Sequence, residues 1–317
     1  MKALLHFAAS SRLRERLSKL GEPRVVVVAE TDDDAFSGEI VDADVLLHVL
    51  KPVTSAMIAA APKLKLIQKI GVGVNTIDRD AAQRAGIAVA NMPGTNTTAV
   101  VEHTLALMLA TLRRVVAFDA AMRNGEGWRL PADAMEALGE LSGSRVGLVG
   151  YGAVPQRLAP VLKALGAEVS FWNRTPRPDA IATPMSLDQL LATSDILSLH
   201  VPLTPETRHW LDRAAIGRLK PGAIVVNTAR GELIDQAALA EALRSERLAG
   251  AGLDVFESEP ITELGLLADC PTVVTTPHIA WLTPQTWERS LGVILENCHR
   301  LQRGEPLLHR VAHSSEA

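Results

Sequence analysis

The sequence lacks the features that mark several large classes of protein. Its two cysteines, Cys270 and Cys298, are too few for a disulfide framework and are typical of a reducing compartment. The net charge of −4 gives no electrostatic basis for binding nucleic acid or an anionic membrane. The longest apolar stretch, residues 104–112, is too short to span a bilayer, and the apolar part of the N-terminus is too short for a secretory signal. We therefore expect a cytoplasmic protein that binds neither nucleic acid nor membrane.

Motifs of common metal and hydrolase sites are also absent. The sequence contains no H-E-x-x-H and no C-x-x-C spacing, so no metal site is expected. It contains no G-x-S-x-G, the turn that presents the nucleophile of many serine hydrolases. At 317 residues the chain is long for one domain, so two domains are expected.

Short apolar segments alternate with helical patterns from the first residue onward. In the first third, strands are expected at residues 2–7, 25–28, 45–49, 66–70 and 88–90, with helices such as 10–20 and 54–61 between them. This alternation predicts a parallel sheet with helices on both faces. The acidic cluster Asp32 to Asp34 is expected to be a solvated loop.

Residues 146–175 form a strand, a glycine turn, a helix and a second strand. Gly150 and Gly152 lie in the turn, where glycines let the backbone approach a pyrophosphate. The N–H groups at the start of the following helix then face the phosphates. This stretch therefore predicts a dinucleotide-binding unit.

The unit departs from the usual pattern at two places. Pro155 stands where a third glycine is expected, and we expect it in the first turn of the helix, where proline is tolerated. Asn173 replaces the acidic residue that binds a ribose 2′-hydroxyl and repels a 2′-phosphate. Arg174, Thr175 and Arg177 offer donors and positive charge instead, which favours NADP(H). The alternative is an NAD(H) enzyme in which Arg174 stacks on the adenine.

Further along, four apolar strands deliver polar or turn residues at their ends. Strands at residues 196–200, 223–226, 250–253 and 273–276 lead to Pro202, Arg230, Asp254 and His278. Open α/β sheets bind ligands at this edge, so these residues are candidates for one site. Residues 204–207 are expected to cap the next helix, with Glu206 in its first turn.

Arg230, Glu259 and His278 have structural as well as functional interpretations. Singly, Arg230 suits a solvated surface arginine, Glu259 a solvated turn before Pro260, and His278 a structural histidine. Together they suit the reduction of a 2-keto acid beside a nicotinamide. An arginine holds a carboxylate bidentately, a histidine exchanges a proton, and a carboxylate favours the charged imidazole.

Three segments remain ambiguous from their residues alone. Gly71 and Gly73 have the spacing of an anion-binding turn, but a plain strand-to-helix turn explains them better. From Ala99 to Met122 the pattern is apolar on nearly all sides, which predicts one long helix buried against the second domain or another subunit. Residues 131–140 are expected to form an irregular or helical connection, and the tail from residue 313 to be disordered.

Taken in order, these motifs resemble the D-isomer-specific 2-hydroxyacid dehydrogenases, the group of phosphoglycerate, glycerate and glyoxylate/hydroxypyruvate reductase-type enzymes. The resemblance covers about residues 64–306. It rests on G-V-G-V-N-T-I-D at 71–78, N-M-P at 91–93 with Asn96 and Glu102, G-Y-G at 150–152, H-V-P-L-T-P-E-T at 200–207, N-T-A-R-G at 227–231, G-L-D-V-F at 252–256 with E-P at 259–260, and P-H at 277–278.

The resemblance implies an α/β protein with two doubly wound parallel-sheet domains. A Rossmann cofactor domain, residues 98–284, would be inserted into a flavodoxin-like substrate domain, residues 1–97 and 285–317. It implies an oxidoreductase that interconverts a small 2-keto acid and its D-2-hydroxy acid with NADP(H), or NAD(H) as the alternative. The apolar region from Ala99 to Met122 would form part of a homodimer interface.

The resemblance also implies roles for single residues. His278 would be the acid/base, Glu259 its partner, and Arg230 the binder of the substrate carboxylate and carbonyl. Val72 and Gly73 would offer backbone N–H groups to that carboxylate, which overturns the plain-turn interpretation.

The implied cofactor contacts are Gly150, Gly152, Ala153, Val154, Asn173, Arg174, Thr175, Val201, Pro202, Thr207, Thr228, Ala229, Asp254 and His278. Among them, Asp254 would hold the nicotinamide carboxamide. Trp281 stands where relatives often have small residues and is expected to contact the substrate, where it would either narrow the pocket or favour an apolar substituent. Both alternatives disfavour phosphoglycerate. Glyoxylate or hydroxypyruvate is the expected substrate.

A second hypothesis comes from a different class of protein. The same fold and triad occur in nicotinamide-dependent transcriptional corepressors of the C-terminal-binding-protein type, whose dimer is a scaffold for other proteins. This sequence has little beyond the catalytic core, so the enzyme is the favoured hypothesis.

Overall fold

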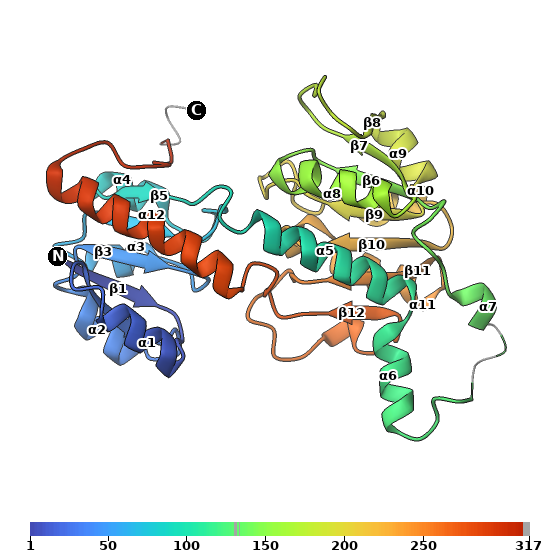
Figure 1. Ribbon diagram of the computed structural model, residues 1–317, viewed down its shortest axis with the longest axis horizontal. Coiled ribbons are helices and arrows are strands. Elements are labelled where there is room, and N and C mark those ends of the chain that lie inside the picture. The colour runs from blue at the N-terminus through green and yellow to red at the C-terminus, as the bar shows by residue number, and fades with distance from the viewer. Residues whose placement is uncertain (130–131, 133, 313–317) are drawn as a thin grey trace. The chain divides into compact units, whose positions relative to one another are not determined.

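A computed structural model describes residues 1–129, 132 and 134–312. The chain divides into two compact units, one formed by Met1–Asn96 with Thr283–Ala317 and the other by Thr97–Leu282. Each unit has its own parallel sheet (Figure 1). Within the described residues, no helix is both long enough and apolar enough to cross a membrane.

The first unit has a five-stranded parallel sheet in the order β2-β1-β3-β4-β5. Its strands are β1 (Lys2–His6), β2 (Arg24–Val28), β3 (Val45–His48), β4 (Leu66–Lys69) and β5 (Ala88–Ala90). Its helices are α1 (Ser11–Ser18), α2 (Asp33–Ile40), α3 (Ser55–Ala59), α4 (Arg79–Arg84) and α12 (Pro284–Arg303). Every residue of β3 and β4 is buried, as expected for central strands of a covered parallel sheet. The strand order is that of the flavodoxin type.

The second unit has a seven-stranded sheet in the order β12-β11-β10-β9-β6-β7-β8. Its strands are β6 (Arg145–Val149), β7 (Glu168–Trp172), β8 (Thr183–Pro184), β9 (Ile196–Leu199), β10 (Ala223–Asn227), β11 (Leu248–Leu253) and β12 (Val273–Thr275). The chain reverses its direction across the sheet between β6 and β9, which is the dinucleotide-binding point of a Rossmann sheet. The two strand orders confirm the predicted fold class.

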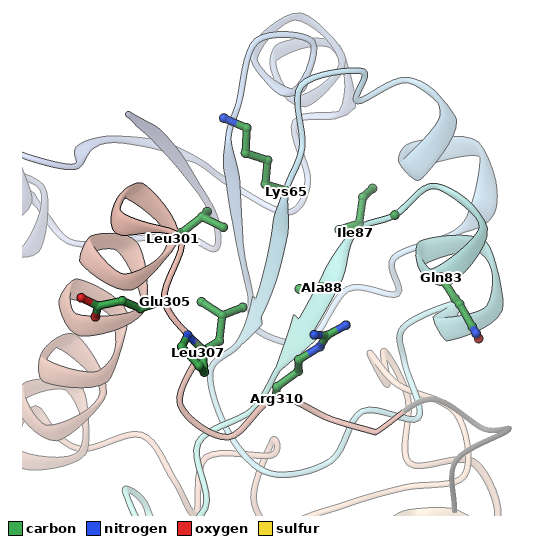
Figure 2. A pocket seen from close by; sticks show the side chains of 11 residues that line it. Lys65, Gln83, Ile87, Ala88, Leu301, Glu305, Leu307 and Arg310 are labelled. Carbon is green, nitrogen blue, oxygen red and sulfur yellow. The ribbon is translucent and has the colours of Figure 1, made fainter.

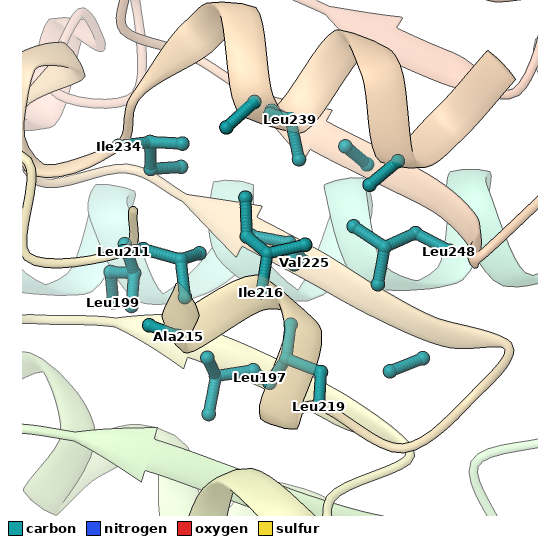
Figure 3. Close-up of a cluster of buried hydrophobic side chains, with 14 of the residues drawn as sticks. Leu197, Leu199, Leu211, Ala215, Ile216, Leu219, Val225, Ile234, Leu239 and Leu248 are labelled. Atoms are coloured by element: carbon teal, nitrogen blue, oxygen red, sulfur yellow. The ribbon is translucent and has the colours of Figure 1, made fainter. Parts of the chain in front are cut away.

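Helices cover both faces of the seven-stranded sheet. On one face lie α5 (Thr97–Leu112) and α8 (Ala153–Ala164), and on the other α9 (Leu187–Thr193), α10 (Arg213–Arg218) and α11 (Gln236–Arg244). Figure 3 shows part of the hydrophobic layer between the sheet and the helices α10 and α11, where Leu197, Val225 and Leu239 are at most 1% exposed. Truncating such a side chain to alanine typically costs about 2–5 kcal/mol, so this layer holds the carboxyl ends of β9 and β10 firmly in place.

The structure corrects three expectations about local structure. Asp32 to Asp34 begin α2 rather than a loop, because the Asp32 carboxylate accepts a hydrogen bond from Ala35 N and caps the helix. Residues 204–207 form a turn, closed by Thr207 N donating to Thr204 O, and the next helix, α10, is capped by Asp212 instead.

The third correction concerns the apolar region from Ala99 to Met122. It forms two helices, α5 and α6 (Val115–Arg123), because Arg114 has a left-handed backbone with φ of 50°. Helix α5 is largely buried, whereas no residue of α6 is buried. The expected connection at 131–140 includes α7 (Ala134–Ala137). Its residues 131 and 133, and the tail from 313, lie outside the described residues.

Candidate active site

Three neighbouring strands bring two predicted catalytic residues, Arg230 and His278, and the predicted cofactor contact Asp254 to one edge of the second unit's sheet. Arg230 follows β10, Asp254 directly follows β11, and His278 follows β12. These strands are adjacent in the sheet and parallel, so their carboxyl ends lie side by side. This is the edge at which open α/β sheets bind ligands.

His278 and Glu259 form a direct pair. The distance from His278 Nδ1 to Glu259 Oε2 is 2.5 Å, and the other oxygen of Glu259 accepts a hydrogen bond from Phe256 N at 2.9 Å. The His278 backbone is left-handed, with φ of 54°, and Trp281 Nε1 donates to the His278 carbonyl at 3.1 Å. Because the carboxylate holds Nδ1, the Nε2 atom is available to exchange a proton. Trp281 is 8% exposed.

Asp254 anchors the backbone that follows His278. Its carboxylate is fully buried and accepts hydrogen bonds from Thr276 Oγ1 at 2.6 Å and from the N–H groups of Ile279 and Ala280, both at 2.9 Å. His103 Nε2 lies 3.5 Å from the same carboxylate. Burial acts to raise the pKa of Asp254, but these hydrogen bonds outweigh it and hold the pKa below its usual value.

The turn that presents Arg230 is held by a buried amide. Asn227 is fully buried, donates to Arg230 O at 2.7 Å and accepts from Ala229 N at 3.0 Å. Burial lowers the pKa of the Arg230 guanidinium, while the nearby carboxylates of Glu259 and Glu232 act to raise it. Glu259 therefore acts on both Arg230 and His278.

The glycine turn after β6 has the properties of a pyrophosphate site. Gly150 has φ of 95°, and a Cβ there would lie 2.7 Å from His200 O, so only glycine allows this turn to approach the loop after β9. Gly152 begins α8 without a side-chain cap, and a Cβ there would meet no atom within 4 Å. As the first residues of α8, Ala153 and Val154 have N–H groups with no intrahelical acceptor, which suits binding of a phosphate group. Pro155 lies in the first turn of α8, as predicted.

Asn173 links the glycine turn to its own segment after β7 through the two ends of its side-chain amide. Tyr151 N donates to Asn173 Oδ1 at 3.0 Å, and Asn173 Nδ2 donates to Thr175 O at 2.7 Å. The side chain of Arg174 is exposed beside it. Both polar atoms of the Asn173 amide thus bond to the protein backbone, and they hold the segment that carries Arg174 beside the glycine turn.

The remaining predicted cofactor residues lie after β9 and β10. Thr207 Oγ1 donates to Pro202 O at 2.7 Å, which closes the loop that begins at Val201. Thr228 Oγ1 lies 2.8 Å from Thr104 Oγ1 of α5. Directly after β9, burial lowers the pKa of His200 to about 4, so this imidazole is neutral at pH 7.

Sequence reasoning assigned no role to two residues that hold these loops, half-buried His103 and fully buried Asn227. Asn227 lies within the N-T-A-R-G motif, but its contact with the carbonyl of Arg230 depends on how the turn folds back. His103 contacts Asp254, which is distant in the sequence, so no local pattern marks it. Among the described residues, no group of three His, Cys, Asp or Glu side chains is arranged to hold a metal. In the first unit, Val72 and Gly73 lie in the turn after β4, and Val72 is 48% exposed.

A separate cavity of about 520 Å³ opens on the first unit (Figure 2). It is lined by residues that include Lys65, Gln83, Leu301, Glu305 and Arg310, at the end of α12 and beside β5. None of the predicted catalytic, substrate or cofactor residues lines it. The chemistry of the strand ends, rather than cavity size, therefore identifies the candidate site.

Comparisons with known proteins agree with this geometry. Residues 105–280, which lie within the second unit, match the family model "D-isomer specific 2-hydroxyacid dehydrogenase, NAD binding domain". A D-3-phosphoglycerate dehydrogenase of Mycobacterium bovis is 38% identical over 279 residues, or 86% of this chain and 52% of that protein. The chain thus spans about half the length of that relative.

Two other relatives match over most of their length. A glyoxylate reductase of Aeropyrum pernix is 39% identical over 272 residues, covering 83% of this chain and 81% of that protein. The crystal structure of an NADPH-dependent glyoxylate/hydroxypyruvate reductase from Sinorhizobium meliloti, in complex with NADP and malonate, has a TM-score of 0.84 at 28% identity. The structural match covers 99% of this chain and 97% of the chain of that reductase. By its matching family model and by its identity to these relatives, the chain belongs to the D-isomer-specific 2-hydroxyacid dehydrogenase family.

Proposed function

We propose that the protein interconverts a small 2-keto acid and its D-2-hydroxy acid with a nicotinamide cofactor. The observation that supports this most directly is the 2.5 Å pair of His278 and Glu259, beside Arg230 at the carboxyl edge of a Rossmann sheet. This arrangement provides a proton donor and a carboxylate binder next to a glycine turn suited to a dinucleotide.

In the proposed mechanism, Arg230 binds the carboxylate and carbonyl of the 2-keto acid, and the N–H groups of Val72 and Gly73 bind the same carboxylate. When bound, the reduced cofactor supplies a hydride to the carbonyl carbon. His278 donates its Nε2 proton to the carbonyl oxygen, and Glu259 stabilises the charged imidazole before that transfer. In the reverse direction His278 accepts the hydroxyl proton.

The cofactor contacts proposed from the sequence are retained, with Asp254 as the partner of the nicotinamide carboxamide and residues 98–284 as the cofactor domain. We propose that NADP(H) is preferred, because exposed Arg174 follows a neutral Asn173 rather than an acid. The similarity to an NADPH-dependent reductase supports this preference. Titrating both cofactors tests it: Arg174→Ala should weaken NADPH binding more than NADH binding. Equal effects on the two affinities would count against the preference.

Glyoxylate or hydroxypyruvate is the proposed substrate. The similarity to reductases of these acids supports it, as does bulky Trp281 beside the His278 loop, proposed to narrow the substrate pocket. We also propose a homodimer formed through α5 and α6, because α6 has no buried residue and Val115, Val116 and Met122 are each more than half exposed. A cytoplasmic location remains a prediction.

A turnover assay with a panel of 2-keto acids and both cofactors tests the proposal. Reduction of glyoxylate or hydroxypyruvate is expected, and His278→Ala should lower kcat by roughly 10²–10⁴-fold while leaving cofactor binding nearly intact. Full activity in His278→Ala would refute the assigned acid/base. Cofactor binding without turnover of any acid would instead favour the corepressor-like scaffold.

A further inference from the structure

Hydrogen bonds within the first unit hold the turn that contains Val72 and Gly73. Met92 N donates to Gly71 O at 2.8 Å, and Asn91 Nδ2 donates to Val72 O at 2.9 Å. Both donors belong to the segment that follows β5. Two successive carbonyl groups of the turn are therefore held from the same side.

Holding these carbonyls also sets the direction of two N–H groups. In a planar trans peptide, the carbonyl of one residue and the N–H of the next point in opposite directions. The bond from Met92 thus orients Val72 N–H, and the bond from Asn91 orients Gly73 N–H. Within the described part of the chain, neither of these N–H groups donates a hydrogen bond. Both are turned away from Asn91 and left available to a ligand.

Asn91 is in turn anchored to the C-terminal segment. Its backbone N–H donates to His309 O at 3.1 Å, and its carbonyl accepts from Gln68 Nε2 at 3.4 Å. Asn297 of α12 donates to Gln68 Oε1 at 2.6 Å and accepts from Leu308 N at 2.7 Å. Gln68 and Asn297 are fully buried, so these bonds are shielded from competition by water.

We propose that Asn91 is a positioning residue for the substrate carboxylate. Its backbone is anchored to the C-terminal segment through His309, and its side-chain amide orients the Val72–Gly73 peptide so that Gly73 N–H faces the ligand. This inference rests on the proposed function, in which that N–H binds the carboxylate of a 2-keto acid. Met92 makes its contact through the backbone, so Asn91 is the member of the pair that substitution can test.

Two substitutions of Asn91 distinguish the effect of losing its hydrogen-bond donor from the effect of losing side-chain volume. Asn91→Ala removes the donor, and Asn91→Asp keeps the volume but places an acceptor against Val72 O. We expect KM for glyoxylate to rise about tenfold in Asn91→Ala, as for the loss of one hydrogen bond, with kcat within about threefold of the parent. Asn91→Asp should be at least as impaired, and the Kd for NADPH should be unchanged in both. Gln83→Ala, which removes an exposed amide from α4 of the same unit, is the matched control.

Hydrogen–deuterium exchange of the free protein gives a readout without activity. Peptides covering residues 70–76 should exchange faster in Asn91→Ala and Asn91→Asp than in the parent or Gln83→Ala. A KM within about twofold of the parent in both variants, or unchanged exchange, would overturn the inference. So would a matching loss of NADPH affinity, which indicates general damage. If the parent reduces no 2-keto acid, the proposed function fails, and the exchange data still decide whether Asn91 orients the turn.

Discussion

At the scale of single residues, the candidate site depends on the absence of a side chain at Gly231. A Cβ at this position would lie 1.9 Å from the carbonyl carbon of Phe256 and 2.0 Å from its oxygen. Gly231 directly follows Arg230, and Phe256 N donates a hydrogen bond to the Glu259 carboxylate. The contact therefore sets the distance between the loop that holds the carboxylate binder and the loop that holds the histidine's partner.

Gly231→Ala should separate these two loops. We expect kcat/KM for the 2-keto acid to fall roughly 100-fold, the loss typical of a displacement of about 1 Å at a reacting centre. Steady-state kinetics measure this, with Gly217→Ala as the control, because a Cβ at Gly217 in α10 meets no atom within 4 Å. Activity of Gly231→Ala within about threefold of the parent would show that the loops tolerate the shift.

At the scale of elements, the break between α5 and α6 changes what the apolar region does. Helix α5 packs against β10 and β11, and its buried residues include Leu107 and Met108. After the left-handed Arg114, α6 presents its apolar residues to solvent instead. The apolar residues of α5 thus contribute to the core of the second unit, whereas those of α6 form an exposed face.

Val116→Glu should disrupt the proposed homodimer. The Val116 side chain is 55% exposed on α6, so a charge there is tolerated in a free subunit but is costly when buried in an interface. Light scattering after size-exclusion chromatography should give a dimer for the parent and a monomer for the variant. Val41→Glu, at a residue 47% exposed in the first unit, controls for the added charge. A monomeric parent, or a dimeric Val116→Glu variant, would contradict the proposed interface.

At the scale of the whole molecule, both units contain histidines whose pKa is lowered by burial. His6 and His48 are paired in register at the ends of β1 and β3 and are at most 3% exposed. Burial, with Lys69 nearby, lowers the pKa of His48 to about 3, and burial with Lys51 lowers that of His6. His200 in the second unit has a pKa of about 4 for the same main reason.

These histidines should make the fold sensitive to acid. Their pKa values are depressed in the folded state, so below about pH 6.5 the unfolded chain binds more protons than the folded one. The free energy of unfolding therefore decreases as the pH is lowered. With a folded-state pKa of about 3, His48 contributes roughly 1.4 kcal/mol per pH unit in this range, so His48→Gln should reduce the loss of stability between pH 6.5 and 5 by roughly 2 kcal/mol. Urea unfolding measures this, with His299→Gln at an exposed position of α12 as the control. Parallel stability curves for parent and His48→Gln would contradict this origin.

Much of the architecture follows from the sequence because strand–helix alternation and glycine turns are local patterns. Arg230, Asp254 and His278 stood out as candidates because each follows an apolar strand, whereas the roles of Glu259, Val72 and Gly73 came from the resemblance to a family. Contacts between distant segments have no such pattern: Asn91 with His309, or His103 with Asp254, arise only when the sheets assemble. Capping by Asp32 and the left-handed Arg114 were missed because charge and apolar periodicity do not reveal backbone conformation.

Asn173 has a consequence for how cofactor use changes over evolutionary time. Replacing it with aspartate introduces the acid that favours NAD(H), and it keeps an acceptor for Tyr151 N. The same change removes the donor to Thr175 O, which holds the segment containing Arg174. One mutation would therefore alter both the preference and the rigidity of the turn. An exchange of cofactor at this position would thus also change a contact that holds the segment containing Arg174.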